Sequence, residues 1–258
     1  MRRRSVVAGA LAACWAAAAR ADGAGAVRVA AASDLQFALP ELAAGFERGT
    51  GIRVELSFGS SGNFARQIEQ GAPLELFLSA DESFALRLAD AGLTANRGAL
   101  YALGRIALIV PAASALALDD RLDGVRRGLA QVQRFSIANP EHAPYGRAAR
   151  EALTAVGLWP QLQPLLVLGE NVSQATQFVA TGAAQAGITA ASLALAPSLA
   201  AQTRRHLLPE SLHQPLRQRM VLMKNPRPAA QAFYEHLRGA DARAVLARFG
   251  FAPAEAAR

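Results

Sequence analysis

The stretch VELSFGSSGNFARQI, residues 54–68, decides the fold class of this 258-residue chain. Residues 54–58 predict a strand, the small polar residues 59–62 predict a turn, and Phe64 with Ile68 begins a helix. A short apolar strand that runs through a polar turn into a helix is the unit expected of an α/β protein with mostly parallel sheets.

Three more units follow the same order of strand, polar turn and helix. Their strands are predicted at 27–30, 135–138 and 165–168, their turns at 33, 139–146 and 169–171, and their helical patterns at 35–46, 149–156 and 172–180. Pro40 interrupts the first of these helices and is expected to kink it. The last two units resemble a second copy of the first two, which predicts two similar α/β domains.

Two apolar runs are expected to carry the chain between these domains. Residues 106–110 and 219–223 are the predicted crossover strands, so the C-terminal helices would return to the first domain. The predicted domains are then 22–105 with 219–258, and 106–218.

The first 21 residues have the three-part pattern of a secretory signal peptide. Arginines at 2–4 precede an apolar run over 6–19, and residues 19–21 fit a cleavage site. We therefore expect a signal peptide at 1–21 and a periplasmic location. Two variants stay open, a twin-arginine signal and acylation of Cys14 as in a lipoprotein.

Composition and charge argue against several classes of protein. Cys14 is the only cysteine, so the mature chain would have neither disulfides nor thiolate metal ligands. The net charge of +7 includes four arginines of the signal, which leaves 7 − 4 = +3 for the mature chain. There is no dense Lys/Arg stripe with interleaved aromatics, so we expect no nucleic-acid partner, whereas a mild positive charge favours a small anion.

The four polar turns predict a site for such an anion. Backbone N–H groups in the first turn of a helix lack helical acceptors and carry a partial positive charge, so converging helix N-termini can bind an oxyanion. Ser33 and Ser61 can add hydroxyl donors, and Gly59, Gly62 and Gly146 let the backbone approach a ligand closely. Ordinary helix capping explains each turn taken alone, and composition does not name the anion.

Longer motifs carry a resemblance to a known family. They are AAASDL at 30–35, SFGSSG at 57–62, ARQIE at 65–69, GAP at 71–73, FLSAD at 77–81, NPEHAPYG at 139–146, AF at 232–233 and FGF at 249–251. In this order they resemble the periplasmic molybdate-binding proteins of ABC importers. The resemblance implies a type II periplasmic-binding-protein fold, in which two α/β domains joined by two crossover strands close around one dehydrated oxyanion.

The same resemblance implies a ligand, its site and its partners. The ligand would be molybdate or tungstate, with no cofactor and no direct metal ligand. The implied ligand-binding residues are Ser33, Asp34, Ser61, Tyr145 and Val172. The two serines would donate hydroxyl and N–H groups, and the other three residues their backbone N–H groups. A membrane permease and a cytoplasmic ATPase would be the partners of a monomer.

Two positions depart from the family pattern. Some relatives add a tyrosine hydroxyl where this chain has Ala190, so one donor is missing. A carboxylate at Asp34 would repel an anion, so we expect it in the first helical turn with its side chain outside the site. Phosphate, which keeps a proton near neutrality, would then bind hardly at all. Turned inward, Asp34 could accept that proton and favour phosphate.

Two alternatives to a molybdate-binding protein stay open. One is a binding protein for another tetrahedral oxyanion, sulfate or phosphate. The other is a hydrolytic enzyme, for which Asp81 and Glu82 resemble paired carboxylates, although a strand-end turn and helix cap fit them better. The four histidines are too scattered for a metal site, and Arg217 with Arg219 is expected to be solvated charge. We therefore expect a binding protein and no enzyme.

Overall fold

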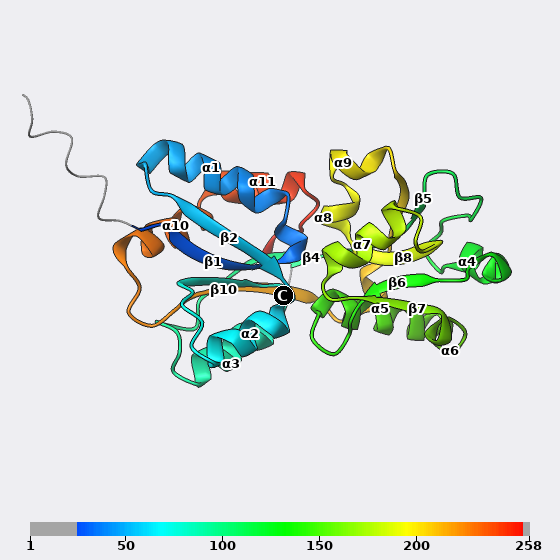
Figure 1. Ribbon diagram of the computed structural model, residues 1–258, viewed down its shortest axis with the longest axis horizontal. Helices are drawn as coiled ribbons and strands as arrows, with labels where there is room; N and C mark the ends of the chain where they lie inside the picture. Colours follow the sequence, from blue (N-terminus) through cyan, green and yellow to red (C-terminus); the bar gives the residue numbers. More distant parts are fainter. Residues whose placement is uncertain (1–24, 255–258) are drawn as a thin grey trace, which may run out of the picture.

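The computed structural model describes residues 25–254, which form two lobes side by side (Figure 1). Each lobe is built on one five-stranded sheet with helices packed against it. The predicted signal peptide and Cys14 lie outside the described residues.

The first lobe contains five strands and six helices. Its strands are β1 (Val27–Ala32), β2 (Val54–Gly59), β3 (Leu76–Ser79), β4 (Ala99–Gly104) and β10 (Leu216–Leu222). Its helices are the 3₁₀ turn η1 (Ser33–Leu35), α1 (Ala38–Thr50), α2 (Ser61–Glu69), α3 (Glu82–Asp90), α10 (Pro228–Leu237) and α11 (Ala240–Arg248).

The second lobe has the same number of strands and more short helices. Its strands are β5 (Ile106–Pro111), β6 (Phe135–Ala138), β7 (Leu166–Gly169), β8 (Ala186–Ala190) and β9 (Thr203–Leu207). Its helices are α4 (Asp123–Arg127), η2 (Leu129–Gln131), α5 (Pro144–Ala155), α6 (Trp159–Leu162), η3 (Gln163–Leu165), α7 (Val172–Ala180), α8 (Ala191–Ala194), α9 (Pro197–Ala200) and η4 (Glu210–Leu212).

The two sheets share one topology. The first has the order β2-β1-β3-β10-β4 and the second the order β7-β6-β8-β5-β9. In each, three neighbouring strands are parallel and the remaining pairings are antiparallel. The carboxyl ends of parallel strands meet at one edge of a sheet, which is where ligands bind in such folds. The predicted fold class, two similar α/β domains, is confirmed.

The crossings between the lobes differ from the prediction. Residues 106–110 pair with β8 and β9 of the second sheet, and residues 219–223 belong with the first sheet, so neither run is shared between the lobes. The chain crosses instead between β4 and β5 and between β9 and β10. Leu216, Arg217 and Gln218 already pair with β4, so the first sheet resumes three residues before 219.

Pro40 does not kink a helix, and that prediction was wrong. The pattern over 35–46 is split, because η1 ends the turn after β1 and α1 begins only at Ala38. Pro40 therefore lies in the first turn of α1, where N–H groups have no helical acceptor and proline is tolerated. Leu39 and Phe46 are both buried on the face of α1 that packs on the sheet.

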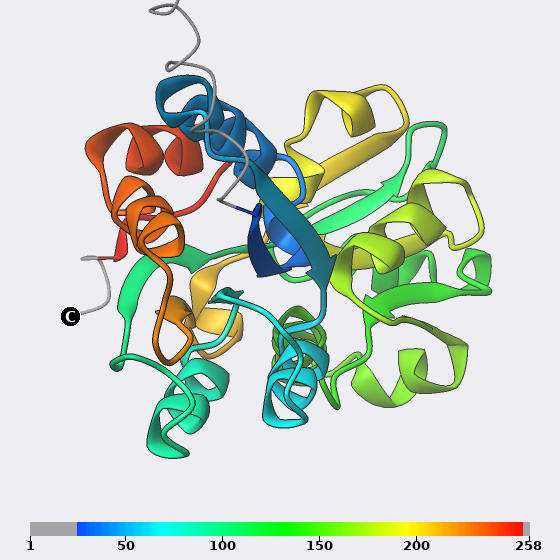
Figure 2. The ribbon, with the colours of Figure 1, turned by 60° about the vertical axis from the view of Figure 1, so that its left-hand side comes forward.

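Helices from both ends of the chain cover the first sheet. Helices α10 and α11 lie beside α1 on one face (Figure 2), where the Phe46 and Phe233 rings are 5.0 Å apart. Helices α2 and α3 pack on the opposite face around Phe77 and Leu88. Between residues 25 and 254, no helix is long and apolar enough to cross a membrane.

Candidate functional site

The polar turns that follow β1, β2, β6 and β7 meet where the lobes face each other (Figure 1). They border a small cavity of about 10 Å³. Its lining residues are Ala32, Ser33, Asp34, Gly59, Ser60, Ser61, Ala80, Ala143, Pro144, Tyr145 and Val172. All five residues predicted for the site are among them, so the fold brings together turns that lie far apart in the sequence.

The two predicted serines are buried and have hydroxyl hydrogens to offer. Ser61 is the first residue of α2 and is fully buried, and its Oγ accepts the N–H of Ala80 at 3.0 Å. Ser33 is 2% exposed, and its Oγ accepts the N–H of Ser173, on α7 of the other lobe, at 3.3 Å. A hydroxyl that accepts a hydrogen bond keeps its own hydrogen for a second partner. Both serines can therefore still donate.

The second lobe contributes two helix N-termini. Helix α5 begins with Pro144, which places Tyr145 in its first turn, and α7 begins with Val172. First-turn N–H groups have no helical acceptor and lie at the positive end of the helix dipole. Tyr145 and Val172 are both buried beside the cavity. Their backbone N–H groups can therefore serve an anion held there.

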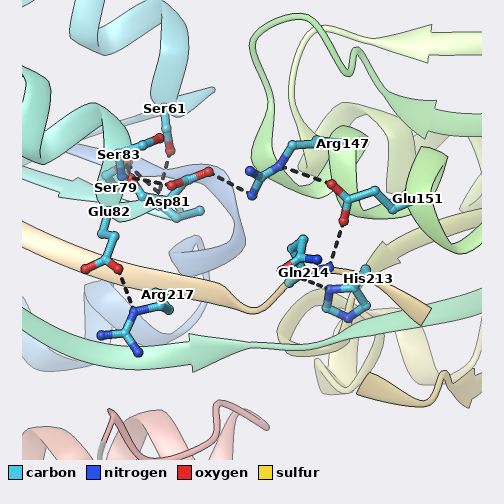
Figure 3. Close-up of polar contacts among 11 residues, drawn as sticks. Ser61, Ser79, Asp81, Glu82, Ser83, Arg147, Glu151, His213, Gln214 and Arg217 are labelled. Carbon is cyan, nitrogen blue, oxygen red and sulfur yellow. Dashed lines mark hydrogen bonds and ion pairs between the residues drawn. The ribbon is translucent and has the colours of Figure 1, made fainter. Parts of the chain in front are cut away.

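Direct contacts hold the lobes together around the cavity. The N–H of Gly62 donates to the carbonyl oxygen of His142 at 2.9 Å, and His142 Nδ1 lies 2.9 Å from Ser60 Oγ. A Cβ on Gly62 would lie 2.7 Å from that carbonyl oxygen, so glycine permits this approach. Arg147 Nη2 on α5 reaches Asp81 Oδ2 of the first lobe at 2.7 Å (Figure 3). The structure is thus a closed form.

The side chain of Asp34, which was expected outside the site, is buried, and Asp34 lines the cavity. It is 1% exposed, and its Oδ2 accepts the Tyr145 hydroxyl at 2.9 Å and the Gln218 Nε2 at 2.6 Å. Ser192 Oγ on α8 also donates to its carbonyl oxygen at 2.8 Å. The second lobe thus covers the first turn after β1.

Burial changes the titration of this group. Desolvation raises the pKa of Asp34 from 3.8 to about 6, against the hydrogen bonds from Gln218 and Tyr145, which lower it. Burial, together with the neighbouring Asp34 charge, raises the pKa of Tyr145 well above its ordinary value. The tyrosine hydroxyl therefore remains a donor. The ring of Tyr145 is fixed by this contact and by burial.

Sequence reasoning missed two residues of this buried network. The Gln218 Oε1 accepts the Tyr101 hydroxyl at 2.7 Å, and the Gln218 side chain is fully buried. Gln218 lies between Arg217 and Arg219, which were expected to be solvated charge. However, Leu216 and Met220 are buried at the same period of two, and this alternation could have placed Gln218 on the inward face. Tyr101 gave no such signal.

The carboxylates considered for hydrolysis have other partners. Asp81 caps α3 by accepting the N–H of Ser83 at 2.8 Å, as predicted. Glu82 forms ion pairs with Arg217 at 2.5 Å and Arg219 at 3.0 Å, so the expectation of solvated arginines was wrong. These contacts hold the pKa of Glu82 below its ordinary value even though desolvation acts against them. No cluster of metal-ligating side chains is present within 25–254.

Comparisons with known proteins place this geometry in a family. Residues 27–252 match the family of bacterial extracellular solute-binding proteins. The chain is 35% identical to the molybdate-binding protein of Azotobacter vinelandii, over 87% of this chain and 89% of the relative. It is 30% identical to a protein of Bacillus subtilis described as a substrate-binding lipoprotein of an ABC transporter, over 86% and 85%.

The structural comparison agrees with the sequence comparison. The solved periplasmic molybdate-binding protein of Azotobacter vinelandii superimposes with a TM-score of 0.80 at 29% identity, covering 87% of this chain and 98% of that structure. The chain therefore belongs to the bacterial extracellular solute-binding proteins, in the group that contains the molybdate-binding proteins.

Proposed function

We propose that this chain captures molybdate or tungstate in the cleft between its lobes and delivers it to an ABC importer. The observation that carries this proposal is a closed cavity bordered by neutral donors from both lobes. Ser33 and Ser61 offer hydroxyl groups, and Tyr145 and Val172 offer first-turn N–H groups. Such a shell suits a fully ionised tetrahedral anion. The relatives named for molybdate support this choice of ligand.

The side chains around the cavity argue against an organic acid as ligand. Recognition of a carboxylate normally uses an arginine fork. Neither Lys nor Arg is among the described residues that line the cavity. Arg147 is the arginine closest in sequence to the turns, and it is paired with Asp81. A lining that offers hydroxyl and backbone N–H donors but no cationic side chain is better matched by a small inorganic oxyanion.

Ala190 has no side-chain donor, so the remaining groups around the cavity must supply the hydrogen bonds to the anion. Ala190 ends β8 and is fully buried, and α8 begins directly after it. The N–H of Ala191, the next residue, is already bonded to the carbonyl oxygen of Arg105 at 2.8 Å. We infer that Ser33, Ser61 and the first-turn N–H groups bind the anion without a donor from this position.

The partners and location follow from the same proposal. A membrane permease with a cytoplasmic ATPase would receive the anion, and the chain would act as a monomer that binds and releases it without turnover. Removal of the signal at 1–21 would leave a periplasmic protein that starts at Asp22, unless Cys14 is acylated. Mass spectrometry of exported protein distinguishes these forms, because a diacylated Cys14 at the N-terminus would replace the start at Asp22.

Calorimetric titration tests the ligand. Mature protein would be titrated with molybdate, tungstate, sulfate and phosphate under identical conditions. We expect tight one-to-one binding of molybdate and tungstate, with no hydrolysis of phosphate or acyl esters in a parallel assay. The proposal fails if neither molybdate nor tungstate binds, or if sulfate or phosphate binds more tightly than both.

A further inference from the structure

Asp34 has the one carboxyl group among the described residues that line the cavity. One of its two carboxyl oxygens has no hydrogen-bond partner among the described residues. Its Oδ2 accepts hydrogen bonds from Tyr145 and Gln218, whereas its Oδ1 is buried without a hydrogen-bond partner among the described residues. A buried carboxylate oxygen is normally hydrogen-bonded, because removal from water without a replacement partner is unfavourable. Oδ1 therefore has no side-chain partner. Burial raises the pKa of this carboxyl group, and besides Gln218 and Tyr145 only the backbone N–H groups of Asp34 and Leu35 are near enough to help lower it.

No positively charged side chain lines the cavity beside Asp34 to offset a second negative charge. The titratable groups that face it are Tyr145 on α5 and Tyr101 on β4, and burial keeps both hydroxyl groups protonated. Gln218 on β10 is neutral. Helices α7 and α8, which pack on η1, have no charged residue. The acid on β2 is Glu55, which lies opposite Arg28 of β1. Glu55 is four positions before Gly59, the end of β2 that lies next to η1.

We propose that the cleft takes up its oxyanion together with one proton, which bridges Asp34 Oδ1 and an oxygen of the bound anion. This inference rests on the proposed function, since it concerns how that same site accepts a dianion. The proton comes from solvent as the lobes close. The carboxylate, the dianion and the proton then share two negative charges in place of three, and a hydrogen bond replaces repulsion between two anions.

Two observations agree with a proton at this position. The pKa of Asp34 is already raised to about 6 by burial in the closed form, and an adjacent anion raises the pKa of a carboxyl further. Oδ2 is saturated by two donors, which leaves Oδ1 as the oxygen to hold the proton. A shared proton also favours more basic anions. Sulfate is a much weaker base than molybdate, so it gains least from the bridge.

Calorimetry measures the proton directly. Titration with molybdate at pH about 7, in two buffers of different ionisation enthalpy, gives the number of protons bound per anion. We expect about 0.5 to 1 for the parent protein, and an affinity that falls by up to about tenfold per unit rise in pH. Asp34→Asn keeps an oxygen acceptor for Tyr145 and Gln218 and provides an N–H group at Oδ1. This variant should bind molybdate without proton uptake.

Asp241→Asn is the matched control, because Asp241 is an exposed acid on α11. It should keep the proton uptake of the parent. Molybdate binding by the parent without proton uptake would overturn the proton bridge and leave the proposed function intact. Failure of the parent to bind molybdate or tungstate would instead overturn the proposed function. Proton uptake that persists in Asp34→Asn would place the proton elsewhere. If Asp34→Asn does not fold, the pH dependence of the parent is the test, and a molybdate affinity that does not change with pH would exclude the bridge.

Discussion

The hydroxyl of Tyr145, on the second lobe, donates a 2.9 Å hydrogen bond to Asp34 Oδ2 on the first. Gln218 Nε2 lies 3.0 Å from the same hydroxyl and 2.6 Å from the same carboxylate oxygen, so three residues from three distant parts of the chain meet beside the cavity. This contact can exist only when the lobes are closed. It therefore links the ionisation of Asp34 to closure.

Removing the Ser61 hydroxyl should weaken oxyanion binding more than removing the Tyr145 hydroxyl. Ser61→Ala deletes a buried donor beside the anion, whereas Tyr145→Phe keeps the backbone N–H that faces the cavity. A hydrogen bond to a charged group contributes about 1.5–3 kcal/mol, so Ser61→Ala should weaken molybdate binding roughly ten- to a hundredfold. Calorimetry checks the order, with the exposed Ser198→Ala as control. Affinity equal to the parent would remove Ser61 from the site.

Disrupting the ion pair between Arg147 and Asp81 should speed release of the anion. The pair joins α5 to the first lobe beside the cavity, with side-chain exposures of 34% and 12%. Partly exposed pairs contribute about 1 kcal/mol or less, so Arg147→Ala should raise the dissociation rate a few-fold with little change in the association rate. Stopped-flow displacement of molybdate measures both rates. An unchanged dissociation rate would show that this pair does not hold the closed form.

Binding should compact the molecule, because Ser33 and Ser61 lie on one lobe and Tyr145 and Val172 on the other. Neither lobe can surround an anion alone, so the free protein is expected to open by hinge motion at the two crossings. Small-angle scattering with and without molybdate should show a smaller radius of gyration for the complex. An identical radius in both states would mean either that the free protein is already closed or that the anion binds elsewhere.

Molybdate and tungstate should bind far more tightly than sulfate. The helix N-termini are fixed by packing on the sheets, so the smaller sulfate would leave some N–H groups too far away to bond. Each unmade bond to a desolvated donor costs about 1–3 kcal/mol, and two or three of them give discrimination of about a thousandfold or more. Competition titrations measure this ratio. Sulfate within tenfold of molybdate would contradict a cavity of fixed radius.

The expectation for phosphate changes with the position of Asp34. Exclusion of phosphate depended on an outward carboxylate, and that carboxylate is buried beside the cavity. Its Oδ1 can accept the proton that phosphate keeps near neutrality, so phosphate is limited by size and not by its proton. We expect phosphate to bind more weakly than molybdate and at least as tightly as sulfate. The same competition titrations measure this order. A phosphate affinity lower than the sulfate affinity would contradict a proton acceptor at Asp34.

To the extent that the free protein adopts the closed form, Asp34 should make it less stable as the pH rises. Its pKa is raised on folding from 3.8 to about 6, so the folded state binds more protons than the unfolded state between these values. Stability is therefore highest below pH about 4 with respect to this group, and falls until pH about 6, by up to about 3 kcal/mol. Asp34→Asn should unfold at higher denaturant concentration than the parent at pH about 7.5, and the difference should shrink at pH about 4.5. An equal midpoint at both pH values would mean that Asp34 is solvated in the free protein.

Local patterns in the sequence were sufficient for the fold class and for the turns that form the site. Strand, polar turn and helix are encoded by neighbours in the chain, and the carboxyl ends of parallel strands must meet at one edge of a sheet. These patterns indicated Ser33 and Ser61, and the family resemblance implied Tyr145 and Val172. The structure places all four beside one cavity.

Only the tertiary structure decided what surrounds Asp34. Its burial depends on Tyr145, Ser192 and Gln218, which lie 111, 158 and 184 positions away along the chain. Helical periodicity shows which face of a single helix is apolar. It contains no information about a second lobe that closes over that helix. Sequence patterns therefore led to the expectation that the acidic side chain of this first turn lies outside the site. Contact between the lobes removes water from Asp34, and this desolvation raises the pKa of its carboxyl group. Hydrogen bonds from Tyr145 and Gln218 fix the direction of the group.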